Sequence, residues 1–165
     1  MAGDATITLF LAGDVMTGRG VDQILAHPSS PRLYEQDIDS ALDYVALAER
    51  ASGPIPRRVE PAYVWGAALE VLDAARPDAR IINLETAITT GEDAEPKGIN
   101  YRMHPANVDV LTAARIDCCV LANNHVLDWG VAGLEETLAT LERAGIRTAG
   151  AGRDAAAARA PATLE

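Results

Sequence analysis

Short apolar runs that suit buried strands alternate with helical patterns along the whole chain. The clearest runs lie at 6–12, 80–84, 117–122 and 146–149. Between these runs, apolar residues recur at the spacing of an amphipathic helix. Strands that alternate with helices are typical of a parallel sheet covered by helices. The pattern therefore predicts an α/β fold with a mostly parallel sheet.

The segments between these strands contain the remaining elements. Residues 26–37, 53–61 and 89–98 are rich in proline, serine or other polar residues and are predicted to be irregular. Residues 150–161 are small and weakly patterned, and no element is predicted there. Helices are predicted at 18–25, 40–51, 62–75, 105–114 and 131–144, and a short strand at 99–103.

Length and composition bound the class of protein. The chain has 165 residues, 48% of them hydrophobic and 23% charged, which fits a single globular domain. The net charge of −10 and the absence of a basic stripe exclude a typical nucleic-acid binder. The acidic balance also argues against binding to an anionic membrane surface. A phosphate substrate stays possible in principle, since a bound dication would invert the local field.

Cysteine use and the N-terminus point to the cytoplasm. Cys118 and Cys119 are adjacent, and neighbours in a strand point to opposite faces and rarely form a disulfide bond. We interpret both as small hydrophobic residues of a buried strand in a reducing compartment. Residues 1–11 lack the basic region of a signal peptide, and no apolar stretch is long enough for a membrane helix. We therefore predict a cytoplasmic protein without a membrane span.

Polar residues follow three of the four predicted strands. Asp14 comes after the first, Glu85 after the second, and Asn124 and His125 after the third. The carboxyl ends of parallel strands meet at one edge, where sites form in open sheets. Carboxylate, amide and imidazole groups are suitable ligands for Mn, Fe, Zn or Mg. The pattern predicts a divalent metal site that could polarise an oxygen or generate a hydroxide.

Each of these residues also has a purely structural interpretation. Asp14 could cap the following helix, and Glu85 could lie in a solvated turn. Asn123 and Asn124 could form a turn that tolerates left-handed geometry, and His125 could be a hydrogen-bonded loop residue. Their shared position at strand ends favours the functional interpretation.

Two further polar residues flank the predicted site. Arg19 follows Asp14 closely and is a candidate catalytic residue, because its fork can bind an anionic substrate group; a surface salt bridge is the alternative. Asp128 could orient the His125 ring, or it could cap the helix that begins near Val131.

Several motifs together resemble the CapA family, which is named for poly-γ-glutamate capsule synthesis. The resemblance covers about residues 6–161 and implies the N-terminal part of a calcineurin-like metallophosphatase α/β sandwich, with 1–165 forming one domain. The motifs, in the family's order and spacing, are GDVMTGR at 13–19, NLET at 83–86, GINYRMHP at 98–105 and ANNHVLDWG at 122–130.

The resemblance assigns roles to the predicted site residues. Asp14 matches the first-strand aspartate ligand, and Glu85 matches the bridging acid after the second motif strand. Asn124 matches the asparagine that binds metal, and His125 matches the histidine that contacts the reacting group, so both are candidate catalytic residues. The phosphoesterase pattern has a histidine where this chain has Met16, and a thioether is a poor ligand for a hard dication. Phosphoesterase activity is therefore not implied.

The resemblance also implies that something follows this chain in the family. Family members continue with further strands and a late histidine cluster that supplies more ligands. We therefore expect a domain that is truncated at its C-terminus, near Glu165. A sheet with an unpaired edge is prone to association, so a homo-oligomer is also expected.

The expected function is that of a CapA-like, metal-dependent protein of capsule or poly-γ-glutamate biosynthesis. It would act as a hydrolase or transferase on a peptide, polyglutamate or phosphate-ester substrate. Two alternatives stay open. One is a metal-dependent peptide epimerase, and the other is a non-catalytic accessory protein or inactive fragment.

Overall fold

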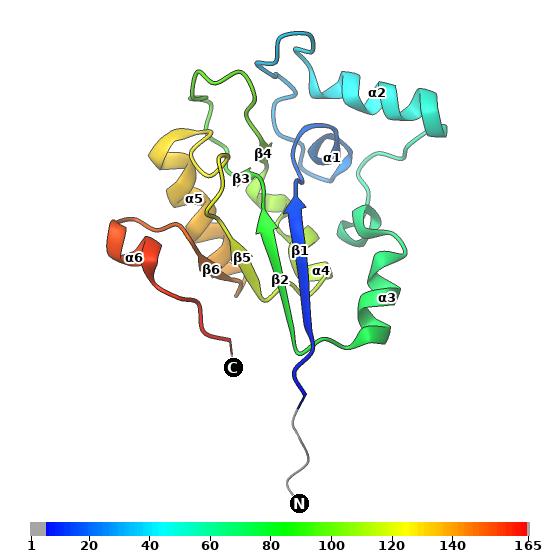
Figure 1. Ribbon diagram of the computed structural model, residues 1–165. Helices are drawn as coiled ribbons and strands as arrows, with labels where there is room; N and C mark the ends of the chain where they lie inside the picture. The colour runs from blue at the N-terminus through cyan, green and yellow to red at the C-terminus, as the bar shows by residue number, and fades with distance from the viewer. Residues whose placement is uncertain (1–5, 165) are drawn as a thin grey trace, which may run out of the picture.

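A four-stranded parallel sheet forms the centre of the structure, a computed structural model that describes residues 6–164 (Figure 1). All neighbouring strands in this sheet are parallel. The predicted α/β class is confirmed, and the architecture is that expected for part of a metallophosphatase-like fold. In spatial order the strands are β1 (Leu9–Val15), β2 (Ala79–Leu84), β5 (Cys118–Val120) and β6 (Arg147–Ala149).

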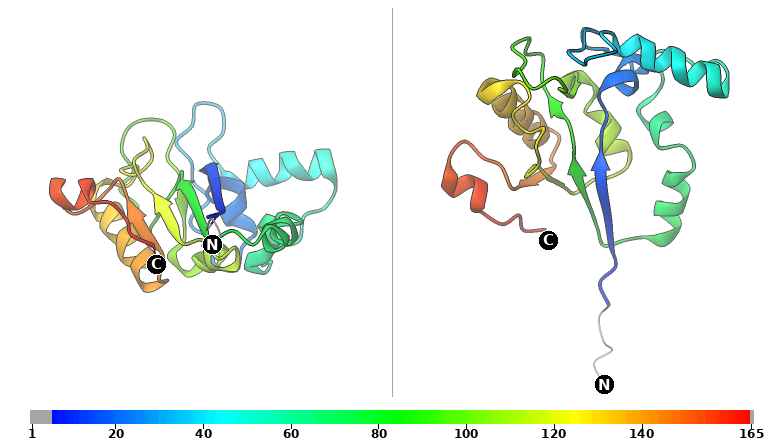
Figure 2. Two further views of the ribbon diagram at one scale, coloured as in Figure 1. Left: turned by 60° about the horizontal axis from the view of Figure 1, so that its bottom comes forward. Right: turned by 45° about the horizontal axis from the view of Figure 1, so that its top comes forward.

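Helices pack on one face of this sheet and beyond its carboxyl edge. Helices α4 (Asp109–Ala113) and α5 (Gly130–Arg143) lie on the same face, whereas α1 (Arg19–Ile24) and α2 (Ala41–Ser52) lie beyond the end of β1 (Figures 1 and 2). The hydrophobic core fills the space between the sheet and the helices. Among its buried residues are Ile82, Leu84, Leu111, Cys119, Leu121 and Leu141.

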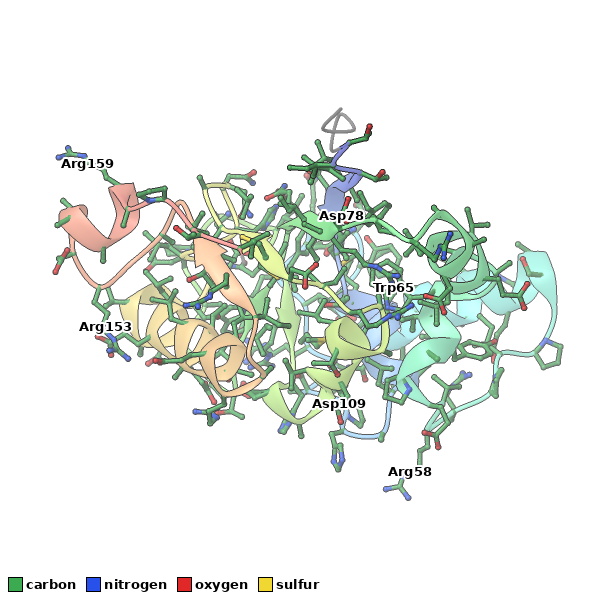
Figure 3. The ribbon with its side chains drawn as sticks, turned by 90° about the horizontal axis from the view of Figure 1, so that it is seen from below. Arg58, Trp65, Asp78, Asp109, Arg153 and Arg159 are labelled. Atoms are coloured by element: carbon green, nitrogen blue, oxygen red, sulfur yellow. The ribbon has the colours of Figure 1, made fainter. Side chains whose placement is uncertain are left out.

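The opposite face of β1 carries exposed apolar side chains. Leu9 and Leu11 are 52% and 66% exposed, and Ile7 before the strand is 72% exposed. Figure 3 shows α4 and α5 on one side of the sheet, and within residues 6–164 no helix covers β1 on the other side. Packing against the helices therefore explains the apolar residues on one face of β1, but it does not explain Leu9 and Leu11 on the other face.

The cysteines take the structural role predicted for them. Both lie buried in β5 as free thiols. Burial raises the pKa of the Cys119 thiol to about 12, so this thiol stays protonated at neutral pH. Within the described residues, no helix is both long and apolar enough to cross a membrane.

The predicted helix at 62–75 is wrong as a single element. The structure instead has a 3-10 helix η1 (Pro61–Trp65) followed by α3 (Ala68–Ala75). Gly66 separates them with a φ of 51°, a left-handed conformation that glycine adopts without steric cost. The apolar spacing continued across the break, so the pattern alone concealed it.

The predicted helix at 105–114 is also divided, into η2 (Pro105–Asn107) and α4. Asn107 lies at the division, and its side chain is committed to a distant segment. Its amide donates to Asp22 Oδ1 at 3.1 Å and to the His27 carbonyl at 2.9 Å. Long-range hydrogen bonds of this kind leave no local signal in the sequence.

Two small elements were not predicted. Strand β3 (Ala87–Ile88) pairs with β4 (Arg102–Met103), which lies within the strand predicted at 99–103. Helix α6 (Ala155–Arg159) lies in the segment considered weakly patterned, where the Asp154 side chain caps it by accepting from Ala157 N at 2.8 Å. The helices predicted at 18–25 and 40–51 are confirmed as α1 and α2.

Candidate functional site

A β-bulge in β1 decides where Asp14 points. Ala12 is in register with Ile82, but the next register pair is Asp14 with Asn83, so Gly13 is an extra residue in the strand. Without this bulge, Asp14 would lie opposite Leu84 and point to the helical face. Because one extra residue reverses the alternation of side chains, Asp14 shares the face of Asn83 instead.

Asn83 joins the two carboxylates of the site. Its Nδ2 donates to Asp14 Oδ1 at 2.8 Å and to Glu85 Oε2 at 2.5 Å. The two acids thus contact the same amide nitrogen, as their shared position at strand ends predicts. Sequence reasoning placed Asn83 in a motif but gave it no role. Its position two residues before Glu85, on the same face of an extended strand, was the available signal.

Asn123 connects this pair to the third strand end. Its Nδ2 donates to Asn83 Oδ1 and to the Leu84 carbonyl, each at 2.9 Å. Its own Oδ1 accepts from His125 N at 3.0 Å. The residue interpreted only as part of a turn therefore fixes that turn against β2.

His125 is buried at the edge of the sheet and held on two sides. Its Nδ1 is hydrogen-bonded to Asp128 Oδ2 at 2.6 Å, and its ring stacks on Tyr101 with centroids 4.0 Å apart. The other ring nitrogen, Nε2, lies 3.9 Å from Glu85 Oε1. Asp128 therefore orients the imidazole, and it does not cap α5, whose first residue is Gly130.

Asn124 lies at an exposed position of the same turn. Its side chain makes no hydrogen bond to any residue between 6 and 164. Its backbone carbonyl accepts from Lys97 Nζ at 2.5 Å. The backbone of Asn124 is thus anchored, and its amide oxygen stays available to a ligand.

Arg19 contacts Tyr101, the residue whose ring stacks on His125. Its guanidinium carbon lies over the rings of Tyr44 and Tyr101, 4.8 and 4.7 Å from their centroids. Its Nε donates to Glu35 Oε1 at 2.7 Å, so the salt bridge considered for Arg19 exists. Glu35 also accepts from the Tyr44 hydroxyl, and this hydrogen bond, together with burial, raises the pKa of Tyr44. The terminal nitrogens of Arg19 donate no hydrogen bond to any described residue.

The donor set fits a divalent cation in its chemistry and is incomplete in its geometry. Two carboxylates, one amide oxygen and one imidazole nitrogen suit a hard or borderline metal. Across residues 6–164, however, no three histidine, cysteine, aspartate or glutamate side chains converge as a metal would require. Met16 adds nothing to the set, because its sulfur accepts from Gly18 N at 3.1 Å. The described residues therefore offer donors that suit a metal without assembling a metal-binding group.

The chain is similar to proteins of two bacteria. Two proteins of Mycobacterium tuberculosis, from strains CDC 1551 / Oshkosh and ATCC 25618 / H37Rv, are named "Probable polyglutamine synthesis accessory protein". Each is 53% identical to this chain over 166 residues, which cover 99% of this chain and 44% of the relative. An uncharacterized protein of Sinorhizobium fredii is 52% identical over 103 residues, or 59% of this chain and 22% of the relative. The chain thus spans less than half the length of these relatives.

A family match covers almost the whole chain. The family described as bacterial capsule synthesis protein PGA_cap matches residues 8–165. This range contains every residue of the site, from the bulge in β1 to the turn before α5. The chain therefore belongs to the bacterial capsule synthesis protein family.

Proposed function

We propose that this chain carries part of the metal site of an accessory protein of capsule-polymer synthesis. In this proposal the protein is a hydrolase or transferase acting on a peptide, polyglutamate or phosphate-ester substrate. The observation that carries it is the position of Asn83 Nδ2 between Asp14 Oδ1 and Glu85 Oε2. The shared amide donor places the two carboxylates at the same edge of the sheet, where ligands from two strands could converge on a cation. The family match and the name of the mycobacterial relatives support the biosynthetic setting.

Three side chains are the proposed ligands. Asp14 and Glu85 supply anionic oxygens, and Asn124 supplies an amide oxygen without another partner among the described residues. A bound Mn, Fe, Zn or Mg ion would polarise a substrate oxygen or lower the pKa of a bound water.

The remaining candidate residues handle the substrate. His125 presents Nε2 beside Glu85 while Asp128 holds Nδ1, so Nε2 is the atom that would give or take a proton. The terminal nitrogens of Arg19 would bind an anionic group of the substrate, with the Tyr44 and Tyr101 rings holding the guanidinium in place.

Elemental analysis tests the proposal. The purified chain, incubated with Mn, Fe, Zn or Mg and then desalted, should retain one of them in stoichiometric amount. Retention should be lost when Asp14→Ala is combined with His125→Ala, and kept in the matched control Glu135→Ala, which removes an exposed carboxylate of α5. A chain that retains no metal after this treatment would contradict the proposed site.

A non-catalytic accessory role is the second candidate. The specific observation in its favour is the incomplete ligand geometry of the described residues. Metal retention without turnover of peptides, polyglutamate or phosphate esters would favour this role. In either case we propose that the protein works in the cytoplasm, since Cys118 and Cys119 are both free thiols; cell fractionation would check this.

A further inference from the structure

Asp128 is a buried carboxylate that joins the segment 95–101 to the turn that carries His125. It is fully buried, and it accepts from Tyr101 N, Lys97 Nζ and His125 Nδ1, each at 2.6 Å. Its backbone carbonyl also accepts from Glu95 N at 2.9 Å and from Asn100 Nδ2 at 3.0 Å. The segment 95–101 is therefore fastened to the turn that carries His125.

Lys97 and His125 are hydrogen-bonded to different oxygens of the Asp128 carboxylate. The ammonium group occupies Asp128 Oδ1, which leaves Oδ2 to Tyr101 N and to the imidazole of His125. A carboxylate can only accept, so the ring proton of His125 must lie on Nδ1, and Nε2 is free to face Glu85. The position of Lys97 thus decides which carboxylate oxygen meets the imidazole.

Lys97 also donates a hydrogen bond to the other end of the same turn. Its Nζ donates to the Asn124 carbonyl at 2.5 Å, so one ammonium group spans residues 124 and 128 on either side of His125. Its side chain is 32% exposed, and it is the only lysine in the chain. An ion pair with a fully buried partner resists screening better than an exposed pair.

We infer that Lys97 is a positioning residue for His125, acting through Asp128 and the Asn124 carbonyl. The segment 95–101 supplies the ammonium group, the Tyr101 amide and the Tyr101 ring that stacks on the imidazole. The segment therefore fixes the tautomer and tilt of the ring before any ligand arrives. This inference rests on the proposed function only for the importance of His125.

The rings of the three histidines provide a direct readout. Protein labelled with ¹⁵N-histidine and freed of metal by a chelator would be studied by long-range ¹H–¹⁵N correlation. His125 should show one tautomer, with a proton on Nδ1 that exchanges slowly. In Lys97→Met, that exchange should become at least roughly tenfold faster. The reason is that Asp128 loses the charged hydrogen bond from Lys97 Nζ and holds the imidazole less firmly. Signals of His27 and His104 serve as internal references.

Matched variants separate positioning from general destabilisation. Lys97→Arg keeps the charge and should restore slow exchange. Arg57→Met breaks the surface pair with Glu49 and should leave His125 unchanged. A single wild-type tautomer and exchange rate in folded Lys97→Met would overturn the inference.

A chemical experiment covers the case in which Lys97→Met does not fold. Acetylation of the folded protein removes the charge of Lys97, its only side-chain amine, whereas reductive dimethylation keeps that charge. Both reagents also modify the N-terminal amine, so dimethylated protein is the matched control. Only acetylation should speed the exchange, and equal behaviour of the two products would overturn the inference. Because all samples are metal-free, a failed metal site gives a separate result.

Discussion

The two halves of the candidate site differ in how firmly the chain holds them. Glu85, His125 and Asp128 are buried, and the side chain of each is hydrogen-bonded. Asp128 in addition accepts from Lys97 and Tyr101 of another segment. Asp14 and Asn124 are exposed, with one hydrogen bond to the side chain of the former and none to that of the latter among residues 6–164. The chain therefore holds the imidazole firmly and leaves the two proposed oxygen ligands, Asp14 and Asn124, exposed. Substitutions in the two halves should separate stability from ligand binding.

Asp128→Ala tests the buried half and should have the largest effect. It leaves the Tyr101 amide and the His125 ring without their acceptor and Lys97 without its counter-charge. We expect a loss of about 3–5 kcal/mol in the free energy of unfolding, measured by urea denaturation. Glu135→Ala is the control. If Asp128→Ala changed the free energy of unfolding as little as Glu135→Ala does, the buried half would not be rigidly built.

Asn83→Leu tests the link between the halves and should have an intermediate effect. It removes the donor shared by Asp14 and Glu85 and leaves Asn123 with one acceptor fewer. The expected loss is roughly 1–3 kcal/mol in the free energy of unfolding. In a double-mutant cycle with Asp14→Asn the effects should not add, since the two side chains are in contact. Additive losses would mean that Asn83 does not join the halves.

Asp14→Asn tests the exposed half and should have the smallest effect on stability. The side chain is exposed and makes one hydrogen bond, so the free energy of unfolding should change by less than about 0.5 kcal/mol. Metal retention should nevertheless fall, because a neutral amide replaces an anionic ligand. A large loss of stability, or undiminished metal retention, would contradict the division of the site into two halves.

The gathering of Asp14, Glu85 and His125 at one edge of the sheet was predictable because it depends on the ends of strands. Apolar runs that stop at Asp14, at Glu85 and before His125 place these residues at one edge of any parallel sheet. The role of Asp128 was left open between orienting His125 and capping a helix. Only the tertiary structure chose between them, by starting α5 at Gly130 and bringing Asp128 Oδ2 to the imidazole.

By itself, the sequence determined the alternation of strands and helices, the parallel sheet and the polar edge, because these follow from periodicity and from residues adjacent in the chain. Only the tertiary structure decided the bulge at Gly13, the bridge through Asn83 and the ion pair of Lys97 with Asp128. The latter two depend on groups 69 and 31 residues apart in the chain. No local pattern records such a distance, since only packing of the whole sheet brings these segments together.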